Sequence, residues 1–507
     1  MTLRITPQQT QRLFGAASTR RLESGAAKGL APHTLMTRAG TSVARLARAL
    51  APHAGRYWIF CGPGNNGGDG FEAAFQLQRS GAVATVVFDG DAGRLPTDAL
   101  RAFEQARGAG VEFVADAGED VQPRDLCIDA LLGIGTRSGG RGARDSVARR
   151  LRSLYLAPCP VLAVDLPSGL DADTGQYADG LAPAGPARSA RHTLSLLTLK
   201  PGLFTGHGRD AAGTVWFDDL GIANDHETPD AVLGGPPAET SRSHASHKGS
   251  FGDVSILGGE GIGRRGMGMS GAALLAGSAA LHAGAGRVLV ALLDADVRLG
   301  VDTSQPELML RTPQALTLDD ATLVCGCGGG DAVRDWLPQV LRKAARLVLD
   351  ADALNAIAAD EGLRQTLKQR ADRQAVTVLT PHPLEAARLL DSETSTVQAD
   401  RLAAARALAE RHGCVVVLKG SGSVIAAPGL TPAINPTGNG RLATAGTGDV
   451  LAGMVGAGLA AAGSGCDLTA AFDAARDAVY RHGAIADAWP AGTPLTAGAL
   501  ARQTPDR

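Results

Sequence analysis

The chain has 507 residues, which is too long for one ordinary domain and predicts two or three. Its formal net charge of -2 and its 4% of aromatic residues argue against a nucleic-acid partner, and the charge also argues against a membrane surface. Hydrophobic residues make up 44% of the chain, enough for well-formed cores, yet no uninterrupted apolar run approaches the length of a membrane span.

Cysteine usage and the first residues bear on the compartment. The seven cysteines are odd in number and show no CxxC spacing, which disfavours a disulfide framework or a structural zinc site. The opening stretch MTLRITPQQTQRLF has no apolar core of signal-peptide length. We therefore expect a cytoplasmic protein.

The first half of the chain alternates predicted strands and helices. After a helical stretch at 8–50, strands are expected at 56–60 and 82–88, and helices at 70–81 and 97–110. The stretches VEFV, LCIDALL and VLAVDLPSG continue the series, and 192–204 and 213–222 end it. Strands alternating with helices predict a parallel sheet covered on both faces.

A polar segment rich in Pro, Gly and Ser divides the chain. We predict domains at 1–225 and 245–507, joined by a linker at 226–244. A second α/β series starts at 252–259 and continues through a small-residue helix at 270–285. It ends in a Gly/Ala-rich helix near 448–462.

The stretch CGPGNNGGDG (61–70) lies between a predicted strand and helix and contains five glycines. In a parallel sheet that junction lies at the carboxyl edge, where ligands bind, and a helix N-terminus suits phosphate. The pattern is neither GxGxxG nor a P-loop. Asp129 and Asp165 follow two other predicted strands, and Ser168 follows in the next turn. Such oxygen donors suit a hard cation.

NNGGDG, DALLGIGTRSG and DLPSGLDADTG resemble the N-terminal domain of the NAD(P)H-hydrate repair proteins, the YjeF N-terminal family, over roughly residues 8–225. The resemblance implies a Rossmann-like three-layer α/β/α sandwich. It also implies an NAD(P)HX epimerase, which interconverts the R and S forms at C6 of the hydrated nicotinamide ring.

The same resemblance assigns residues. It implies that potassium is held by Asn66, Asp129 and Ser168, and that Asp165 contacts the ring as the candidate acid/base. A basic residue that is Lys in some relatives is Arg137 here, and the two side chains are not interchangeable. The substrate-binding residues it implies are Asn65, Asn66, Gly67, Gly68, Asp69, Gly133, Ile134, Gly135, Thr136, Arg137, Ser138, Gly139 and Asp165.

The strongest feature of the second half is the stretch Ala445-Gly446-Thr447-Gly448 entering a helix near Asp449. Glycines and a helix N-terminus form an anion hole for phosphoryl oxygens, and Asp449 stands where a general base belongs. His382 lies between two prolines in TPHPLEA, a stiff turn that favours a ligand contact.

GTGD before a small-residue helix is typical of the ribokinase superfamily. Residues 245–500 resemble the C-terminal domain of the same repair proteins, a ribokinase-like α/β/α domain with ADP- or ATP-dependent NAD(P)H-hydrate dehydratase activity. The resemblance implies a magnesium ion and favours ADP as co-substrate. It places the hydrate against Ala272, Gly328, Gly330, His382 and Asp449, and the nucleotide against Lys419, Gly420, Ser421, Gly422, Ser423 and Gly448.

Two stretches depart from the family pattern. GCGGG (326–330) stands where GPGLG is usual, and GGEGIGRRGMGMSGA (258–272) is longer and more basic than its counterpart and lacks its tyrosine. We therefore expect the contacts of these two loops to differ from those of relatives.

Two alternatives stay open on the sequence. The chain could be a ribokinase-like kinase of a small vitamin-like alcohol with a non-catalytic nucleotide-binding first domain, or its first half could be a binding module for nucleotides or partner proteins. As partners we expect the dinucleotides NADHX and NADPHX and ADP, with no nucleic acid and no membrane. Relatives further suggest a homo-oligomer assembled through the second domain.

Overall fold

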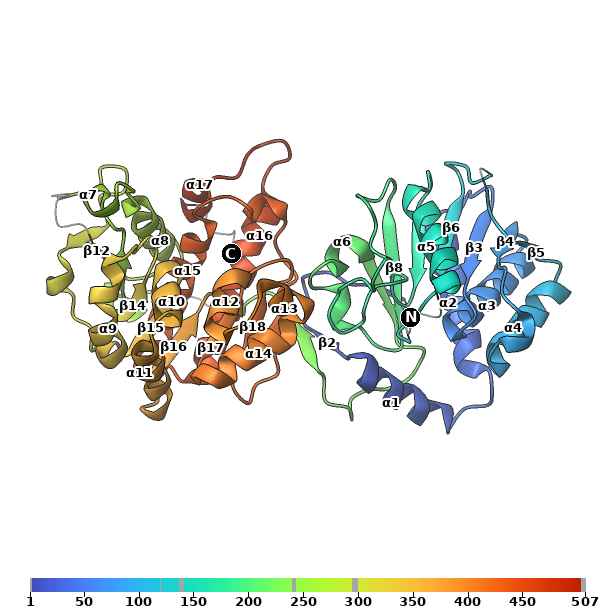
Figure 1. The fold of residues 1–507 in the computed structure, drawn as a ribbon, viewed down its shortest axis with the longest axis horizontal. Helices are drawn as coiled ribbons and strands as arrows, with labels where there is room; N and C mark the ends of the chain where they lie inside the picture. Colours follow the sequence, from blue (N-terminus) through green and yellow to red (C-terminus); the bar gives the residue numbers. More distant parts are fainter. Residues whose placement is uncertain (1, 119, 136–140, 239–242, 294–299, 503–507) are drawn as a thin grey trace. The chain divides into compact units, whose positions relative to one another are not determined.

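The computed structural model describes residues 2–118, 120–135, 141–238, 243–293 and 300–502 (Figure 1). The chain divides into two compact units, residues 1–6 with 11–231 and residues 7–10 with 232–507. The boundary lies inside the segment 226–244. That segment also contains strand β10 (Ala231–Leu233), which pairs in parallel with β19 (Ala433–Ile434). None of the described helices is long and apolar enough to cross a membrane.

The sheet of the first unit has the strand order β1-β9-β8-β7-β6-β3-β4-β5, and only the edge strand β1 is antiparallel to its neighbour. From β3 and β6, which are neighbours, the chain adds strands in opposite directions. This switch point is where a parallel sheet opens a crevice at its carboxyl edge. The strands are β1 (Leu3–Arg4), β3 (Tyr57–Cys61), β4 (Ala84–Val87), β5 (Glu112–Val114), β6 (Leu126–Ala130), β7 (Val161–Val164), β8 (Arg191–Leu196) and β9 (Thr214–Asp218).

Helices cover both faces of this sheet. Along β3, Tyr57 and Ile59 pack into the core beneath α2, α3 and α4, whereas Trp58 and Phe60 pack on the other face with residues of α5. The predicted three-layer α/β/α sandwich is therefore confirmed. The helices are α1 (Ala16–Ala27), α2 (Thr34–Leu50), α3 (Asn65–Arg79), α4 (Thr97–Gly108), α5 (Arg141–Leu156) and α6 (Gly208–Ala212).

Local predictions in this unit need three corrections. The stretch 8–50 is not one helix but β2 (Gln11–Leu13), α1 and α2, because His33 breaks the helical path with a φ of 71°. The sequence did not predict α5, since its many arginines leave only a narrow apolar stripe. Finally, α3 begins at Asn65, five residues before the expected start, so the glycine-rich stretch forms the first turns of a helix.

The second sheet runs in the order β13-β12-β11-β14-β15-β16-β17-β18-β19-β10. It is parallel from β13 to β17, and β18 is antiparallel to both of its neighbours. Its switch point lies between β11 and β14. The strands are β11 (Asp253–Gly258), β12 (Arg287–Leu292), β13 (Met309–Arg311), β14 (Thr322–Cys325), β15 (Arg346–Leu349), β16 (Val376–Leu379), β17 (Val415–Leu418), β18 (Val424–Ala426) and β19.

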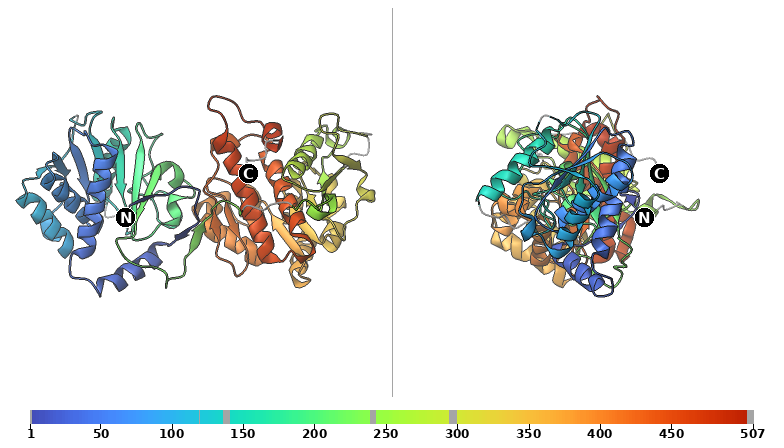
Figure 2. Two further views of the ribbon diagram at one scale, coloured as in Figure 1. Left: turned by 180° about the vertical axis from the view of Figure 1, so that it is seen from behind. Right: turned by 90° about the vertical axis from the view of Figure 1, so that its right-hand side faces the viewer.

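Helices of the second unit also form two layers around its sheet (Figure 2). The Gly/Ala-rich helix at 447–462 is not the last one, because the amphipathic helices α16 and α17 follow it. The described helices are α7 (Ile262–Arg265), α8 (Ser270–His282), α9 (Leu337–Lys343), α10 (Ala351–Ala358), α11 (Glu361–Asp372), α12 (Pro383–Leu390), α13 (Thr394–Ala399), α14 (Arg401–His412), α15 (Thr447–Ala462), α16 (Leu468–Ala488) and α17 (Ala497–Arg502).

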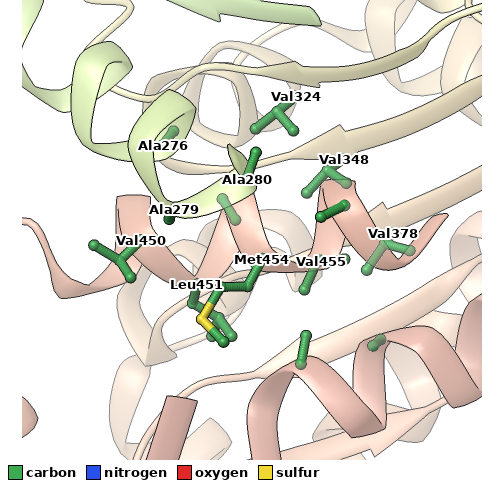
Figure 3. Close-up of a cluster of buried hydrophobic side chains, with 14 of the residues drawn as sticks. Ala276, Ala279, Ala280, Val324, Val348, Val378, Val450, Leu451, Met454 and Val455 are labelled. Carbon is green, nitrogen blue, oxygen red and sulfur yellow. The ribbon is translucent and has the colours of Figure 1, made fainter. Parts of the chain in front are cut away.

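Small residues let α15 lie very close to α8 in the core (Figure 3). Val450 and Leu451 of α15 pack near Ala276 and Ala279 of α8. A Cβ placed on Gly453 would lie 2.1 Å from the backbone oxygen of Ala276. This close approach fixes the N-terminus of α15, the element that carries Asp449.

Gly453→Ala tests the close approach of α15 to α8. Alanine is normally the better helix former, but here its methyl group would collide with a backbone atom. We therefore expect the free energy of unfolding to fall by about 1–3 kcal/mol in a urea titration. Gly465→Ala is the control, because a Cβ there would meet nothing within 4 Å, and it should stay within about 0.5 kcal/mol of wild type. Equal stability of the two variants would contradict the packing argument.

Candidate active sites

A cavity of about 550 Å³ lies at the switch point of the first sheet. It is walled by the first turn of α3, by the loop after β6, by α1 and α2, and by the strand end that bears Asp165. The predicted epimerase residues that line it are Asn65, Asn66, Asp69, Gly133, Ile134, Gly135 and Asp165. Thr136, Arg137, Ser138 and Gly139 lie outside the described residues.

Gly67 and Gly68 do not line this cavity. A Cβ on Gly67 would lie 1.9 Å from the Gly62 oxygen, and one on Gly68 would lie 2.5 Å from the Met36 methyl carbon. These glycines therefore serve the close packing of α3 against its neighbours, and this need outweighs the roughly 1 kcal/mol that each glycine costs a helix.

Asp165 is joined to a buried lysine that the sequence did not single out. Lys200 forms an ion pair with Oδ1 of Asp165, and its side chain is fully buried. The same oxygen accepts a hydrogen bond from the Leu196 backbone N–H at 3.0 Å. In the sequence, the only signal was a lone lysine in the otherwise apolar stretch LSLLTLKPGLF.

Three further carboxyl groups line the cavity with Asp165, those of Glu23, Asp69 and Asp98. Burial and the charge of Asp165 raise the pKa of Asp69 well above its usual range. Asp69 is the fifth residue of α3, so it is not the helix cap. Glu23, at the exposed rim of the cavity, also has a raised pKa, first from partial desolvation and then from Asp165. The cavity thus holds the lysine-bound Asp165 beside two carboxyl groups whose pKa values are raised, those of Asp69 and Glu23.

The three predicted potassium ligands lie around one backbone carbonyl. The Ser168 hydroxyl donates to Oδ1 of Asp129 at 2.6 Å, and the Ser168 N–H donates to Oδ2 at 3.0 Å. Asn66 donates to the Leu132 oxygen at 3.1 Å. Asp129 is fully buried and forms no ion pair in the described part of the chain. Burial therefore raises the pKa of Asp129, and these oxygen donors fit a hard monovalent cation.

In the second unit, Asp449 occupies the first turn of α15, after the N-cap Gly446 with its φ of 88°. Burial, and then the neighbouring Asp350, raise the pKa of Asp449 to about 6. A carboxylate with that pKa is a competent general base near neutral pH.

Asp350, at the end of β15, is a second residue that the sequence reasoning missed. Its Oδ1 accepts hydrogen bonds from Lys419 at 2.7 Å and from the Thr380 hydroxyl at 2.8 Å. Burial tends to lower the pKa of Lys419, but the carboxylates of Asp350 and Glu385 outweigh it and the pKa is raised. A Cβ on Gly448 would lie 3.3 Å from the Lys419 nitrogen, so this cation stands at the N-terminus of α15.

His382 caps α12. Its Nδ1 accepts the N–H groups of Leu384 and Glu385 at 3.2 Å, and Glu385 returns a bond to the His382 N–H at 2.8 Å. This fixes a neutral tautomer with the proton on Nε2, in line with the lowering of the His382 pKa by burial and then by Lys419. The buried Glu385 carboxyl has its pKa raised to about 7, chiefly by desolvation.

The turn 419–423 follows β17 and bends through Gly420 and Gly422, whose φ angles are 141° and 63°. The hydroxyl of Ser423 accepts the Gly420 N–H at 3.3 Å, and Ser421 is exposed. Beneath the turn, the buried Arg401 donates to the oxygens of Leu418 and Lys419 at 3.2 Å. These hydrogen bonds from Arg401 fix the backbone at the start of the turn.

Ala272 and Gly328 lie together, because a Cβ on Gly328 would be 2.8 Å from that of Ala272. Gly330 faces another group: its Cβ would lie 2.4 Å from both the Arg265 guanidinium and the Glu260 carboxyl. Glu260, fully buried, bonds Arg265 at 2.5 Å and accepts the Ala332 N–H at 2.7 Å. Glu260, which thus anchors the GCGGG stretch (326–330), belongs to the loop 258–272, the other stretch that differs from the family pattern.

Cys327, Asp350 and Asp449 each offer one possible metal-ligand atom, and these atoms lie within 4.8 Å of one another. A thiol is a poor ligand for magnesium, and Asp350 is already bonded to Lys419. The protein side chains by themselves therefore fit this metal poorly. A magnesium ion here would depend on phosphate oxygens, as is usual for it.

Comparison with known proteins identifies the lineage. Residues 32–202 match the family model YjeF-related protein N-terminus, and residues 262–504 match that of NAD(P)H-hydrate dehydratase. The bifunctional NAD(P)H-hydrate repair enzyme Nnr of Escherichia coli is 36% identical over 90% of this chain and 85% of its own. Its namesake in Vibrio cholerae is 36% identical over 92% of this chain and 90% of its own.

A single-domain relative matches the second unit. The ADP-dependent (S)-NAD(P)H-hydrate dehydratase of Neisseria meningitidis serogroup B is 38% identical over 52% of this chain and 86% of its own. Since full-length relatives cover both units at more than 30% identity, the chain belongs to the family of bifunctional NAD(P)H-hydrate repair enzymes.

Proposed function

We propose that the first unit epimerises the R and S forms of NAD(P)HX and that the second dehydrates the S form to NAD(P)H, with ADP converted to AMP and phosphate. One observation carries this proposal: similarity to bifunctional repair enzymes extends over both units, and each unit presents a lysine-bound aspartate beside a second acidic group at the carboxyl edge of its sheet. A stand-alone small-molecule kinase would not need the first of these sites.

For the epimerase, the chemistry follows from the hydrated ring being a hemiaminal at C6. An acid protonates the C6 hydroxyl, the C6–O bond breaks with its electron pair leaving as water, and the ring nitrogen lone pair forms the C6=N bond. Water then adds to the other face and gives its proton to a base. We assign Asp165, the lysine-bound carboxylate, as the base and Asp69, whose protonated form is favoured, as the acid. In the opposite direction the two exchange roles.

Asn66, Asp129 and Ser168 would hold the potassium ion, and the support is the buried, unpaired carboxylate of Asp129 among neutral oxygen donors. A cation there would fix the loop that carries Gly133 and Ile134 at the cavity wall. The glycine-rich start of α3 would face the dinucleotide phosphates.

For the dehydratase, Asp449 accepts the proton of the C6 hydroxyl as that oxygen attacks the terminal phosphorus of the nucleotide. The P–O bond to AMP breaks, the C6 phosphate then leaves with its electron pair, and loss of a C5 proton restores the C5=C6 double bond. Lys419 and the N–H groups at the start of α15 lie where they would bind the transferred phosphoryl oxygens. A magnesium ion held mainly by the nucleotide would neutralise phosphate charge. The turn 419–423 would hold the nucleotide, with His382, Ala272 and Gly328 on the hydrate.

The cysteines bear on the cellular setting. The seven cysteines are free and six of them are buried, which suits a reducing cytoplasm. Assembly into a homo-oligomer through the second unit stays a prediction from the resemblance.

The decisive assay gives purified protein a mixture of R- and S-NADHX with ADP or with ATP, and follows NADH absorbance. With ADP, we expect complete conversion of both epimers and one AMP and one phosphate for each NADH. ATP should support a lower rate. A stable phosphate ester in place of NADH would instead show that the second unit is a kinase. Conversion of only the S epimer would contradict the epimerase activity proposed for the first unit.

The dehydratase rate should follow the titration of Asp449. Because the base must be ionised, kcat/KM on S-NADHX should fall about tenfold per pH unit below about pH 6. Asp449→Asn should lower kcat by about 10²–10⁴-fold and leave KM for ADP within a few-fold. The matched control is the exposed Asp372→Asn, which should behave as wild type. A pH profile that is flat down to pH 4.5 would contradict the role of Asp449.

A further inference from the structure

Lys200 lies in a short segment that leaves β8 and turns back beneath the cavity. Leu197 takes a φ of 65°, and the Thr198 N–H bonds the Leu196 oxygen at 2.7 Å, so the chain makes a tight turn there. The side chain of Lys200 has no exposed surface. A charge so deeply buried is tolerated only when its hydrogen-bonding capacity is filled.

The Lys200 ammonium meets that condition. Besides its ion pair with Asp165, it donates to the oxygens of Leu196 at 2.8 Å and of Thr198 at 2.9 Å. The Ser195 hydroxyl oxygen lies 3.5 Å from the same nitrogen, so acceptors of the protein surround the ammonium and leave none of its three protons for a substrate. Lys200 is therefore not a group that touches substrate, and its effect on the reaction must pass through Asp165.

Asp165 is fixed from both its backbone and its side chain. Its φ is 67°, and its N–H bonds the Leu194 oxygen at 2.7 Å. Oδ1 is occupied by Lys200 and by the Leu196 N–H. Oδ2 has no hydrogen-bond donor in the described part of the chain, and the Asp165 side chain lines the cavity.

From this arrangement we infer that Lys200 is a positioning residue of the epimerase site: its ammonium holds Oδ1 of Asp165 and so presents Oδ2 to the substrate. The inference rests on the proposed role of Asp165 and adds the residue that selects its reactive oxygen. No relative's name or family match assigns Lys200 a role.

The charges around Asp165 show why a cation is needed there. Glu23 comes from α1 and Asp69 from α3, and both are carboxyl groups that repel the Asp165 charge. Arg20, on α1, acts on Glu23, while Lys200 is the cation bonded to Asp165 itself. Asp98, from α4, also lines this cavity. Removal of Lys200 would leave Asp165 among these carboxyl groups without its bonded cation, so the acid and base roles would no longer be separated.

The test compares Lys200→Met, Lys200→Gln and Asp165→Asn in the full chain, with R/S interconversion followed by chromatography of the epimers without nucleotide. Both lysine variants should lower kcat for epimerisation at least tenfold. They should also move the acid limb of the pH–rate profile upward by about one unit, because a neighbouring positive charge has been removed. A purely structural role would lower the rate without moving the profile. Lys200→Gln keeps side-chain donors, so it provides the measurement if the methionine variant does not fold.

A double-mutant cycle supplies the second readout. In the Asp165→Asn background, Lys200→Met should change the residual rate by no more than about twofold, since its whole effect passes through the carboxylate. The control is Lys28→Met, at the exposed C-terminal end of α1, and it should match wild type.

The outcomes separate the two proposals. If Asp165→Asn is inactive and Lys200→Met behaves as wild type, the inference about Lys200 is overturned and the proposed epimerase stands. If Asp165→Asn is fully active, the inference about Lys200 and the proposed role of Asp165 are both contradicted. If Lys200→Met lowers the rate further in the Asp165→Asn background, Lys200 acts by another route and the inference is also overturned.

Discussion

The cost of burying charge at the carboxyl edge of a parallel sheet governs both sites of this protein. In each unit a lysine from one strand end bonds an aspartate from another, Lys200 with Asp165 and Lys419 with Asp350. A carboxylate removed from water is costly to bury without a partner, and in each unit the lysine supplies that partner. The neighbouring groups then have raised pKa values, Asp69 in the first unit and Asp449 in the second. Each site thus places a lysine-bound aspartate beside an acidic group with a raised pKa, an arrangement suited to acid–base chemistry.

The sequence predicted the fold class and the main motifs because both are local patterns. Alternating apolar and helical stretches predicted the parallel sheets, and the strand ends bearing Asp129, Asp165 and Ser168 do meet in space. The sequence analysis did not identify Lys200 and Asp350 because their partners lie 35 and 69 positions away along the chain. A local sequence pattern cannot indicate a pairing over such a separation. The start of α3 was misplaced because helix propensity rejects glycine, whereas close packing against Gly62 demands it.

The two loops that depart from the family pattern compensate for each other. GCGGG has lost a proline that would restrict its backbone, and Gly328 and Gly330 take positive φ angles of 56° and 54°. Glu260 of the longer loop supplies the missing restraint, since its carboxylate binds the Ala332 N–H just beyond these glycines and its backbone N–H bonds the Gly328 oxygen at 2.7 Å. Arg265 offsets the charge of the fully buried Glu260. The extra basic residues of this loop therefore serve first to hold its own carboxylate.

In the proposed reaction, the placement of Lys419 would link phosphate binding to the basicity of Asp449. Its ammonium bonds Asp350 and lies beside Gly448 at the positive end of α15. Anionic phosphate entering this position would compete for the ammonium and for the helix N-terminus, and Asp350 would gain negative field at the moment that Asp449 must accept a proton. Because Asp350 is the charged group with the largest effect on Asp449, nucleotide binding would make Asp449 a stronger base when its substrate is in place. In the proposed reaction, the ion pair between Lys419 and Asp350 would therefore keep Asp449 a weaker base until the phosphoryl donor binds.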